Sequence, residues 1–180
     1  FRDMANLPSV VILGDYEQAL RRFSNWTRVD QRCHIAIYHE PLHGEALYEA
    51  AKDADVIVLV RDRIPFNEAL IARLPKLKLF IFTGKRNGTL DASALIARNI
   101  PIACTPGGPS KETTTELTWA LILGASKHLV RQNKLVDSGS WRDECSVLPM
   151  LAGQRLGIIG MGSIGSSVAR VGKAFGMELV

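Results

Sequence analysis

Three glycines with the spacing Gly160-x-Gly162-x-x-Gly165 are the strongest chemical signal in the sequence. They follow an apolar run at residues 156–159 and open a stretch with helical periodicity at residues 164–175. Between a strand and a helix, the first glycine permits a tight turn and the second lets backbone amides approach a pyrophosphate. The third lets the helix pack close to its strand, and the helix N-terminus offers unpaired amides to an anion. This context favours a dinucleotide site over a simple tight turn.

The identity of the dinucleotide depends on an acidic residue that normally lies about 20 positions further on and holds the ribose hydroxyls. That place falls at or just beyond Val180, the last residue of the sequence. Glu178 begins the next predicted strand and does not end it, so we do not assign it this role. Both NAD and NADP therefore stay open as cofactors.

Four cations follow two neighbouring predicted strands. Arg61 and Arg63 come after the third strand, and Lys85 and Arg86 come after the fourth. Ligands bind beyond the carboxyl ends of the strands in open parallel sheets, and Arg is suited to bidentate capture of a carboxylate. The four cations therefore predict a substrate that carries a carboxylate. The alternative, a solvated surface cation, is favoured for Arg63 and Lys85 and is as strong as the site hypothesis for Arg61 and Arg86.

The segment His39-Glu-Pro-Leu-His43 matches the zinc-protease pattern H-E-x-x-H. That pattern binds zinc only on a helix, where positions i and i+4 face one metal. Pro41 removes a hydrogen bond and clashes with the preceding turn inside a helix, at a cost of about 3 kcal/mol or more. We therefore predict a loop after the second strand, with a helix that starts near Pro41, and no metal site.

The elements that must position these groups alternate between short apolar strands and helical stretches. Strands are predicted at residues 10–13, 34–38, 55–60, 77–82 and 100–104. Helices are predicted at residues 16–23, 45–52, 67–74 and 91–98, the last with Asp91 as its N-cap. Continuously apolar strands that alternate with helices are typical of a parallel sheet covered on both faces.

The pattern changes after residue 104. Residues 105–111 form a hinge rich in Pro and Gly, and a long helix is predicted from about residue 113 to 137. Its apolar side chains cover more than one face, so we expect it to be buried, with a partner subunit as one source of cover. After a loop at residues 138–152, a second α/β domain begins with the glycine turn. We therefore expect one domain at residues 1–104 and a second at residues 105–180.

Composition and charge exclude several classes of protein. The 180 residues are 47% hydrophobic and 22% charged, and no apolar run approaches the length of about 20 residues that spans a bilayer. The net charge of +4 comes from scattered Lys and Arg, whereas a nucleic-acid-binding protein needs a concentrated basic face. The cysteines form neither a disulfide framework nor a metal spacing, which favours the cytoplasm. They are Cys33, Cys104 and Cys145.

Several segments, taken in order, resemble the D-isomer-specific 2-hydroxyacid dehydrogenases. They cover most of the chain from about residue 50 onward. The matching segments are Ala54-Asp-Val-Ile-Val-Leu-Val-Arg61, Leu74-Pro-Lys-Leu-Lys-Leu79, Thr83-Gly-Lys-Arg-Asn87, Leu90-Asp91, Arg98-Asn-Ile-Pro-Ile102, Thr105-Pro-Gly107, Thr115-Glu-Leu-Thr-Trp-Ala-Leu121 and residues 156–180.

The resemblance implies two three-layer α/β domains. Residues 1–104 would be a flavodoxin-like substrate-binding domain without its C-terminal return segment. Residues 105–180 would begin an NAD(P)-binding Rossmann domain that is truncated at its second strand. The helix at residues 113–137 resembles the dimer-forming segment of the family, which implies a homodimer.

The resemblance also assigns roles to residues. Arg61 matches a contact to the substrate carboxylate, and the loop that holds Gly84, Lys85 and Arg86 matches the substrate loop. Ser163 and Ile164 would line the cofactor phosphates together with the three glycines, and Thr114 would lie near the nicotinamide. Many members carry a Gly-x-Gly-x-Asp-Asn loop, whereas this chain reads Gly84-Lys-Arg-Asn-Gly-Thr89, so its detailed substrate contacts differ.

The resemblance implies hydride transfer between NAD or NADP and a small D-2-hydroxy or 2-keto acid of unspecified identity. The Arg, Glu and His that catalyse it in the family would lie beyond residue 180, and no histidine of this chain sits at a matching position. We therefore name no catalytic residue and expect the chain as given to be inactive. Two alternatives stay open: a dinucleotide-sensing transcriptional corepressor of the same fold, and a complete 180-residue interaction module.

Overall fold

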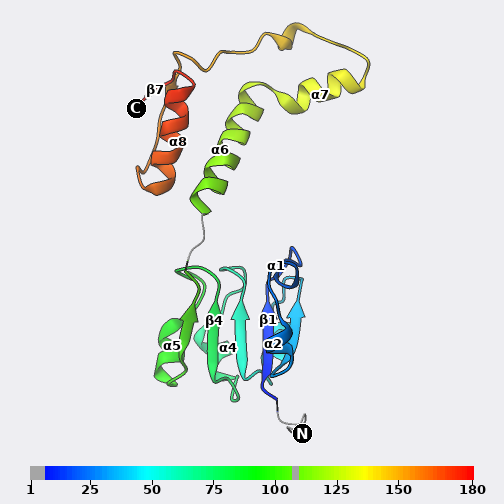
Figure 1. The fold of residues 1–180 in the computed structure, drawn as a ribbon, viewed down its shortest axis with the longest axis vertical. Helices are drawn as coiled ribbons and strands as arrows, with labels where there is room; N and C mark the ends of the chain where they lie inside the picture. The colour runs from blue at the N-terminus through cyan, green and yellow to red at the C-terminus, as the bar shows by residue number, and fades with distance from the viewer. Residues whose placement is uncertain (1–6, 107–109) are drawn as a thin grey trace. The chain divides into compact units, whose positions relative to one another are not determined.

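The computed structural model describes residues 7–106 and 110–180, and each of these two ranges forms a compact unit of its own. The first unit contains a five-stranded sheet with the strand order β2-β1-β3-β4-β5, and all neighbouring strands are parallel. In Figure 1 the arrows of this sheet point the same way. The predicted parallel α/β fold is confirmed, and the order is that of flavodoxin-like sheets.

The strands of the first unit are short and alternate with helices, as predicted. The strands are β1 (Ser9–Leu13), β2 (His34–Tyr38), β3 (Val56–Leu59), β4 (Leu79–Phe82) and β5 (Ile102–Cys104). The helices are α1 (Leu20–Phe23), α2 (Thr27–Asp30), α3 (Gly44–Ala51), α4 (Glu68–Ala72) and α5 (Ala92–Ala97). Asp91 caps α5 as predicted, because its carboxylate accepts a hydrogen bond from the amide of Ala94.

The core of the first unit lies on the face of the sheet that α3, α4 and α5 cover. Parallel register aligns Val11, Ile57 and Phe80 in one row across β1, β3 and β4. Leu47 from α3 and Ile71 from α4 belong to the same buried cluster. In the sheet, β2 lies on one side of β1, and β3, β4 and β5 follow one another on its other side. Because crossover connections between parallel strands are right-handed, α1 and α2 lie on the face of the sheet opposite to α3, α4 and α5. The parallel register places the carboxyl ends of all five strands in one row.

Two predictions for the first unit need correction. The predicted helix at residues 16–23 is helical only from Leu20, because the buried Asp15 carboxylate accepts hydrogen bonds from the amides of Ala19 and Leu20 and so sets a late start. The helix α2 was not predicted, since it spans a single turn with no buried residue and therefore leaves no apolar periodicity.

The second unit contains α6 (Ser110–Ser126), α7 (Leu129–Asp137), the short 3-10 helix η2 (Glu144–Ser146) and α8 (Ser163–Ala174). Its two strands, β6 (Arg155–Leu156) and β7 (Glu178–Leu179), pair in parallel. Among the described residues of both units, no helix is long and apolar enough to cross a membrane.

The prediction of one continuous helix at residues 113–137 is wrong. His128 adopts a left-handed backbone with φ of +46°, which interrupts the helical hydrogen-bond ladder between α6 and α7. Within the unit only one side of α6 is buried: Trp119 is 5% exposed, whereas Leu117 and Leu121 are 60% and 65% exposed. We expected several faces of this helix to be buried, and contacts inside the unit bury only one face of α6.

Trp119 joins α6 to α8. Its ring centroid lies 5.0 Å from that of Phe175, and its indole N–H donates to the carbonyl oxygen of Val168 at 3.2 Å. Gly172 lets α8 approach β6 closely, because a Cβ there would lie 2.7 Å from Leu156 Cδ2. The side chains beneath α8 thereby fix the position of its N-terminus.

Candidate functional site

The glycine turn connects β6 to α8 with the geometry that an anion site needs. Gly160 has φ of +94°, a conformation that side chains rarely adopt. A Cβ at Gly165 would overlap the carbonyl oxygen of Gly160, so the helix can approach the turn only with glycine at that position. A Cβ at Gly162, in contrast, would meet nothing within 4 Å, so the space beside this residue is open.

The first turn of α8 presents free backbone donors beside that open space. Gly162 is the N-cap and offers no side chain to the amides of Ser163, Ile164 and Gly165, and these amides make no backbone hydrogen bond to any residue that the structure describes. The next amide, that of Ser166, already donates to the carbonyl oxygen of Gly162 at 2.9 Å. Three free amides at the positive end of a helix dipole can bind a pyrophosphate.

The other residues considered for the cofactor lie in different elements. Glu178 is the first residue of β7, so it does not lie at the carboxyl end of that strand. Thr114 lies exposed in α6, and its carbonyl oxygen accepts a hydrogen bond from the hydroxyl of Thr118 at 2.7 Å. The nicotinamide role of Thr114 stays a prediction.

In the first unit, the loops after β3, β4 and β5 are tied to one another. The Arg61 amide donates to Thr83 Oγ1 at 2.9 Å, and the Gly84 amide donates to Thr105 Oγ1 at 2.9 Å. Asn87 Nδ2 donates to the carbonyl oxygen of Arg61 at 3.3 Å. Sequence reasoning missed the bonding role of both threonines, although each directly follows an apolar strand.

Arg61 lies at the centre of these ties in an unusual conformation. Its φ is +62°, in a region that costs a non-glycine residue of the order of 1 kcal/mol or more and is often found at functional sites. Its guanidinium lies against the β4 loop, because a Cβ at Gly84 would be 3.9 Å from Arg61 Nη1. Neighbouring loops thus hold a strained arginine beside the predicted substrate loop.

The four predicted cations fall into two groups. Arg61, Lys85 and Arg86 are exposed and take part in none of the ion pairs found among the described side chains. Arg63, in contrast, donates to both carboxylate oxygens of Glu17 at 2.5 and 2.6 Å and to the carbonyl oxygen of Gly14 at 2.6 Å.

Arg63 therefore has a structural role. Its guanidinium also stacks on the ring of Tyr16 at 4.9 Å, and its hydrogen bonds lower the pKa of Glu17 to about 2. These contacts clamp the loop after β1 to the loop after β3. Arg61, Lys85 and Arg86 stay as candidates for a bound carboxylate.

The H-E-x-x-H segment is a loop, as predicted. His39 follows β2, while His43 has an extended backbone and is the N-cap of α3. The helix begins at Gly44, which is later than the start near Pro41 that we predicted. His39 Nδ1 lies 2.9 Å from the carbonyl oxygen of Asp15, so the imidazole is held by the first strand's loop.

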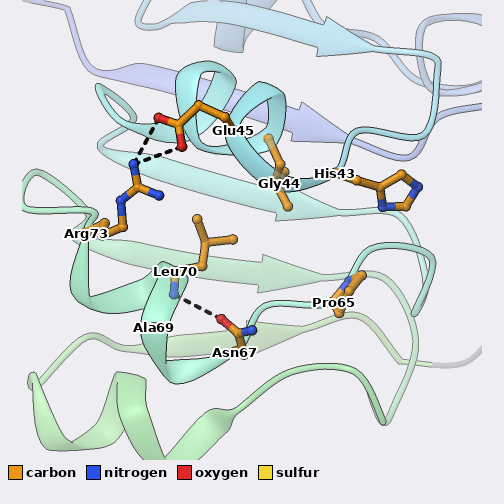
Figure 2. Close-up of a pocket in the computed structure, with 9 residues that line it drawn as sticks. His43, Gly44, Glu45, Pro65, Asn67, Ala69, Leu70 and Arg73 are labelled. Atoms are coloured by element: carbon orange, nitrogen blue, oxygen red, sulfur yellow. Dashed lines mark hydrogen bonds and ion pairs between the residues drawn. The ribbon is translucent and has the colours of Figure 1, made fainter.

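A cavity of about 320 Å³ lies between α3 and α4 on one face of the first sheet (Figure 2). Of its polar side chains, those of Glu45, Asn67 and Arg73 already bind one another or the backbone, whereas His43 makes no side-chain cap at the start of α3. Arg73 donates to the Glu45 carboxylate at 2.9 and 3.1 Å, and Asn67 Oδ1 accepts from the amide of Leu70 at 3.0 Å. The cavity therefore presents little free binding chemistry.

Asp143, Glu144 and Cys145 place one potential metal-ligand atom each within 4.8 Å of one another. Asp143, however, pairs with Arg131, and this hydrogen bond lowers the pKa of the carboxyl. The same carboxylate caps η2. These structural contacts account for the cluster without a metal.

Comparison with known proteins identifies a family to which this chain is similar. Residues 119–180 match the family model described as D-isomer specific 2-hydroxyacid dehydrogenase, NAD binding domain. Glyoxylate reductase from Aeropyrum pernix is 36% identical over 150 residues, which cover 79% of this chain and 44% of that protein. The chain thus spans less than half the length of this relative. The match to an NAD-binding domain confirms the prediction of a nicotinamide cofactor.

Solved structures resemble both units. A phosphoglycerate oxidoreductase from Vibrio cholerae has a TM-score of 0.82 and 32% identity, over 96% of this chain and 55% of that one. A D-lactate dehydrogenase from Aquifex aeolicus, complexed with NAD and lactic acid, has a TM-score of 0.72 and 25% identity. That match covers 94% of this chain and 50% of the other.

Proposed function

The chain belongs to the D-isomer specific 2-hydroxyacid dehydrogenase family, and on that premise we propose that its protein reduces a small 2-keto acid to the D-2-hydroxy acid, and catalyses the reverse. Reduction consumes one hydride from NADH or NADPH and one proton. The observation that carries the proposal is the turn at Gly162, where open space meets three free amides.

The glycine turn is proposed to bind the cofactor pyrophosphate. The amides of Ser163, Ile164 and Gly165 donate to its oxygens, and glycine at position 162 leaves room for it. When bound, the nicotinamide supplies the hydride acceptor or donor. The open turn fits this group, since any side chain at Gly162 would occupy the space that the phosphate needs.

The carboxyl edge of the first sheet is proposed to bind the acid. Arg61 donates to the substrate carboxylate, and its strained backbone is held for this purpose by Thr83 and Asn87. The loop of Gly84, Lys85 and Arg86 completes the site. No residue of this chain is proposed to transfer the proton, so these 180 residues alone are proposed to bind ligands without turnover.

We also propose a homodimer through the second unit. A groove of about 700 Å³ lies between α6 and α7, and its apolar side chains include Leu121 and Val130, which are 65% and 74% exposed. A second copy would cover them. Leu121→Glu should then produce monomers in sedimentation equilibrium, while Ile96→Glu, at an equally exposed site in the first unit, should leave the dimer intact. A monomeric unmodified protein would exclude this role.

The cytosol is the proposed compartment. Cys33, Cys104 and Cys145 are all free thiols in the structure, which suits a reducing environment.

The direct test is a titration of the natural protein that carries this sequence with NADH and NADPH, followed by a panel of 2-keto acids. We expect saturable quenching of tryptophan fluorescence by one coenzyme and its oxidation by at least one acid. Coenzyme binding without turnover of any acid would favour the corepressor alternative. The absence of any response to both coenzymes would reject both functions.

A further inference from the structure

We propose that the acid bound at the carboxyl edge of the first sheet carries a second anionic group, a carboxylate or a phosphate, besides its C1 carboxylate. This inference rests on the proposed function, because it assumes that the edge binds an acid. It narrows the substrate class to 2-hydroxy or 2-keto acids with at least two negative charges.

The charge balance of the two loops is the first observation. Arg61, Lys85 and Arg86 are exposed and unpaired within the described structure, and the β4 loop from Thr83 to Thr89 contains no acidic residue. The only carboxylate on the β3 loop is that of Asp62. These two loops therefore carry three cations without an ion pair and one carboxylate, and one additional carboxylate from a simple acid would still leave a net positive charge.

The absence of a carboxylate partner does not extend to Arg63, a fourth cation of the same two loops. Arg63 lies two residues from Arg61 on the same loop, yet Glu17 neutralises it with two hydrogen bonds. Among the described side chains, a carboxylate thus pairs with the structural cation Arg63 and none pairs with Arg61, Lys85 or Arg86. Cations that stay unpaired beside one another repel, and an anionic ligand removes that repulsion.

The geometry around Gly84 brings the Arg61 guanidinium and the backbone of Arg86 to the same glycine. A Cβ at Gly84 would lie 3.9 Å from Arg61 Nη1 and 3.9 Å from the carbonyl oxygen of Arg86, so both residues border this glycine. The loop is fixed by the bond from the Gly84 amide to Thr105 Oγ1. We assign the C1 carboxylate to Arg61 and the second anionic group to Arg86, with Lys85 beside it.

Two matched pairs of acids test the proposal. D-malate is D-lactate with one added carboxylate, and 3-phospho-D-glycerate is D-glycerate with one added phosphate. We expect calorimetry on the natural protein with saturating NADH to show that, in at least one pair, the acid with the added group binds at least about tenfold more tightly than its partner acid. This ratio of the two dissociation constants is the benefit of a charge-assisted hydrogen bond. Whichever pair shows the larger ratio identifies the second group as a carboxylate or a phosphate.

Variants assign the effect to this loop. Arg86→Gln should reduce the ratio of dissociation constants toward one, because binding of the acid with the added group should weaken more than binding of its partner acid. Arg28→Gln is the matched control, because Arg28 is an exposed arginine of α2 that forms no ion pair with any described side chain, and its ratio should stay at the wild-type value. Thermal unfolding of both variants checks that the fold is intact.

The outcomes separate this proposal from the proposed function. Equal binding within both pairs, or a ratio that survives in Arg86→Gln, overturns the second anionic group and leaves the dehydrogenase function standing. If NADH binds but none of the four acids does, the acid-binding role of this edge is overturned, and this proposal with it.

Discussion

The two candidate anion sites of this molecule use opposite means. The turn before α8 offers backbone amides and open space, and its glycines serve by having no side chain. The carboxyl edge of the first sheet offers Arg61 and Arg86, whose side chains project from loops that distant residues hold. A backbone site is therefore destroyed by adding atoms, and a side-chain site is destroyed by removing them.

The largest combined effect on NADH affinity and on stability is expected from Gly165→Val. Its side chain would overlap the carbonyl oxygen of Gly160, so α8 must move away from the turn. Two displaced amide–phosphate bonds correspond to about 100-fold weaker NADH binding, and the strain costs roughly 1–3 kcal/mol of stability. NADH titration and thermal unfolding measure both effects.

Gly124→Ala is the matched control for that substitution. A Cβ at Gly124, inside α6, would meet nothing within 4 Å, so NADH affinity should not change. Stability should rise by about 0.5–1 kcal/mol, since alanine is the better helix former. Unchanged NADH affinity in Gly165→Val would show that the close approach at Gly160 has no role in binding.

Arg61→Ala should produce a smaller effect confined to the acid. Loss of one charge-assisted contact raises KM for the acid by roughly 10-fold to 100-fold, while kcat changes little. NADH affinity should stay at the wild-type value, which distinguishes the two sites. Steady-state kinetics of the natural protein measure KM and kcat separately, and an unaltered KM for the acid would show that Arg61 does not belong to the site.

The smallest effect is expected from Glu17→Gln, which weakens the clamp on Arg63. The KM for the acid should rise by less than about fivefold, because exposed ion pairs contribute little. The pKa of Glu17 is lowered from 4.5 to about 2 by Arg63, so its contribution to stability is present above pH 4.5 and is lost as the pH falls to 2.

The pH dependence of unfolding checks the clamp. The wild type should be more stable than Glu17→Gln at pH 7, and the difference should shrink between pH 4.5 and pH 2. A difference in stability that is the same at pH 7 and pH 2 would contradict the role assigned to Arg63.

Local patterns in the sequence predicted the features that depend on local geometry. The glycine spacing identified the turn at Gly160, and Asp91 marked the start of α5, because each of these features is decided within a few residues. The parallel sheet followed from the alternation of apolar strands with helices. Contact with distant residues was not needed for any of these predictions.

The features that the sequence did not predict depend on distant partners or on single backbone angles. Glu17 binds Arg63 across 46 positions, and Thr83 binds the Arg61 amide across 22, so neither contact leaves a periodic signal. No glycine or proline marks the break between α6 and α7 at His128 in the sequence, and its left-handed φ is known only from the folded chain. Sequence reasoning could therefore name the four cations but could not tell the clamp from the site.

The central claim is that backbone amides beside Gly162 bind the cofactor pyrophosphate, and Gly162→Val tests it most directly. Nothing lies within 4 Å of a Cβ at this position, so the thermal unfolding midpoint should match that of the wild type. We expect NADH affinity measured by calorimetry to fall by at least about 100-fold, because the valine occupies the space of the ligand. A folded Gly162→Val protein that binds NADH as tightly as the wild type would contradict the account.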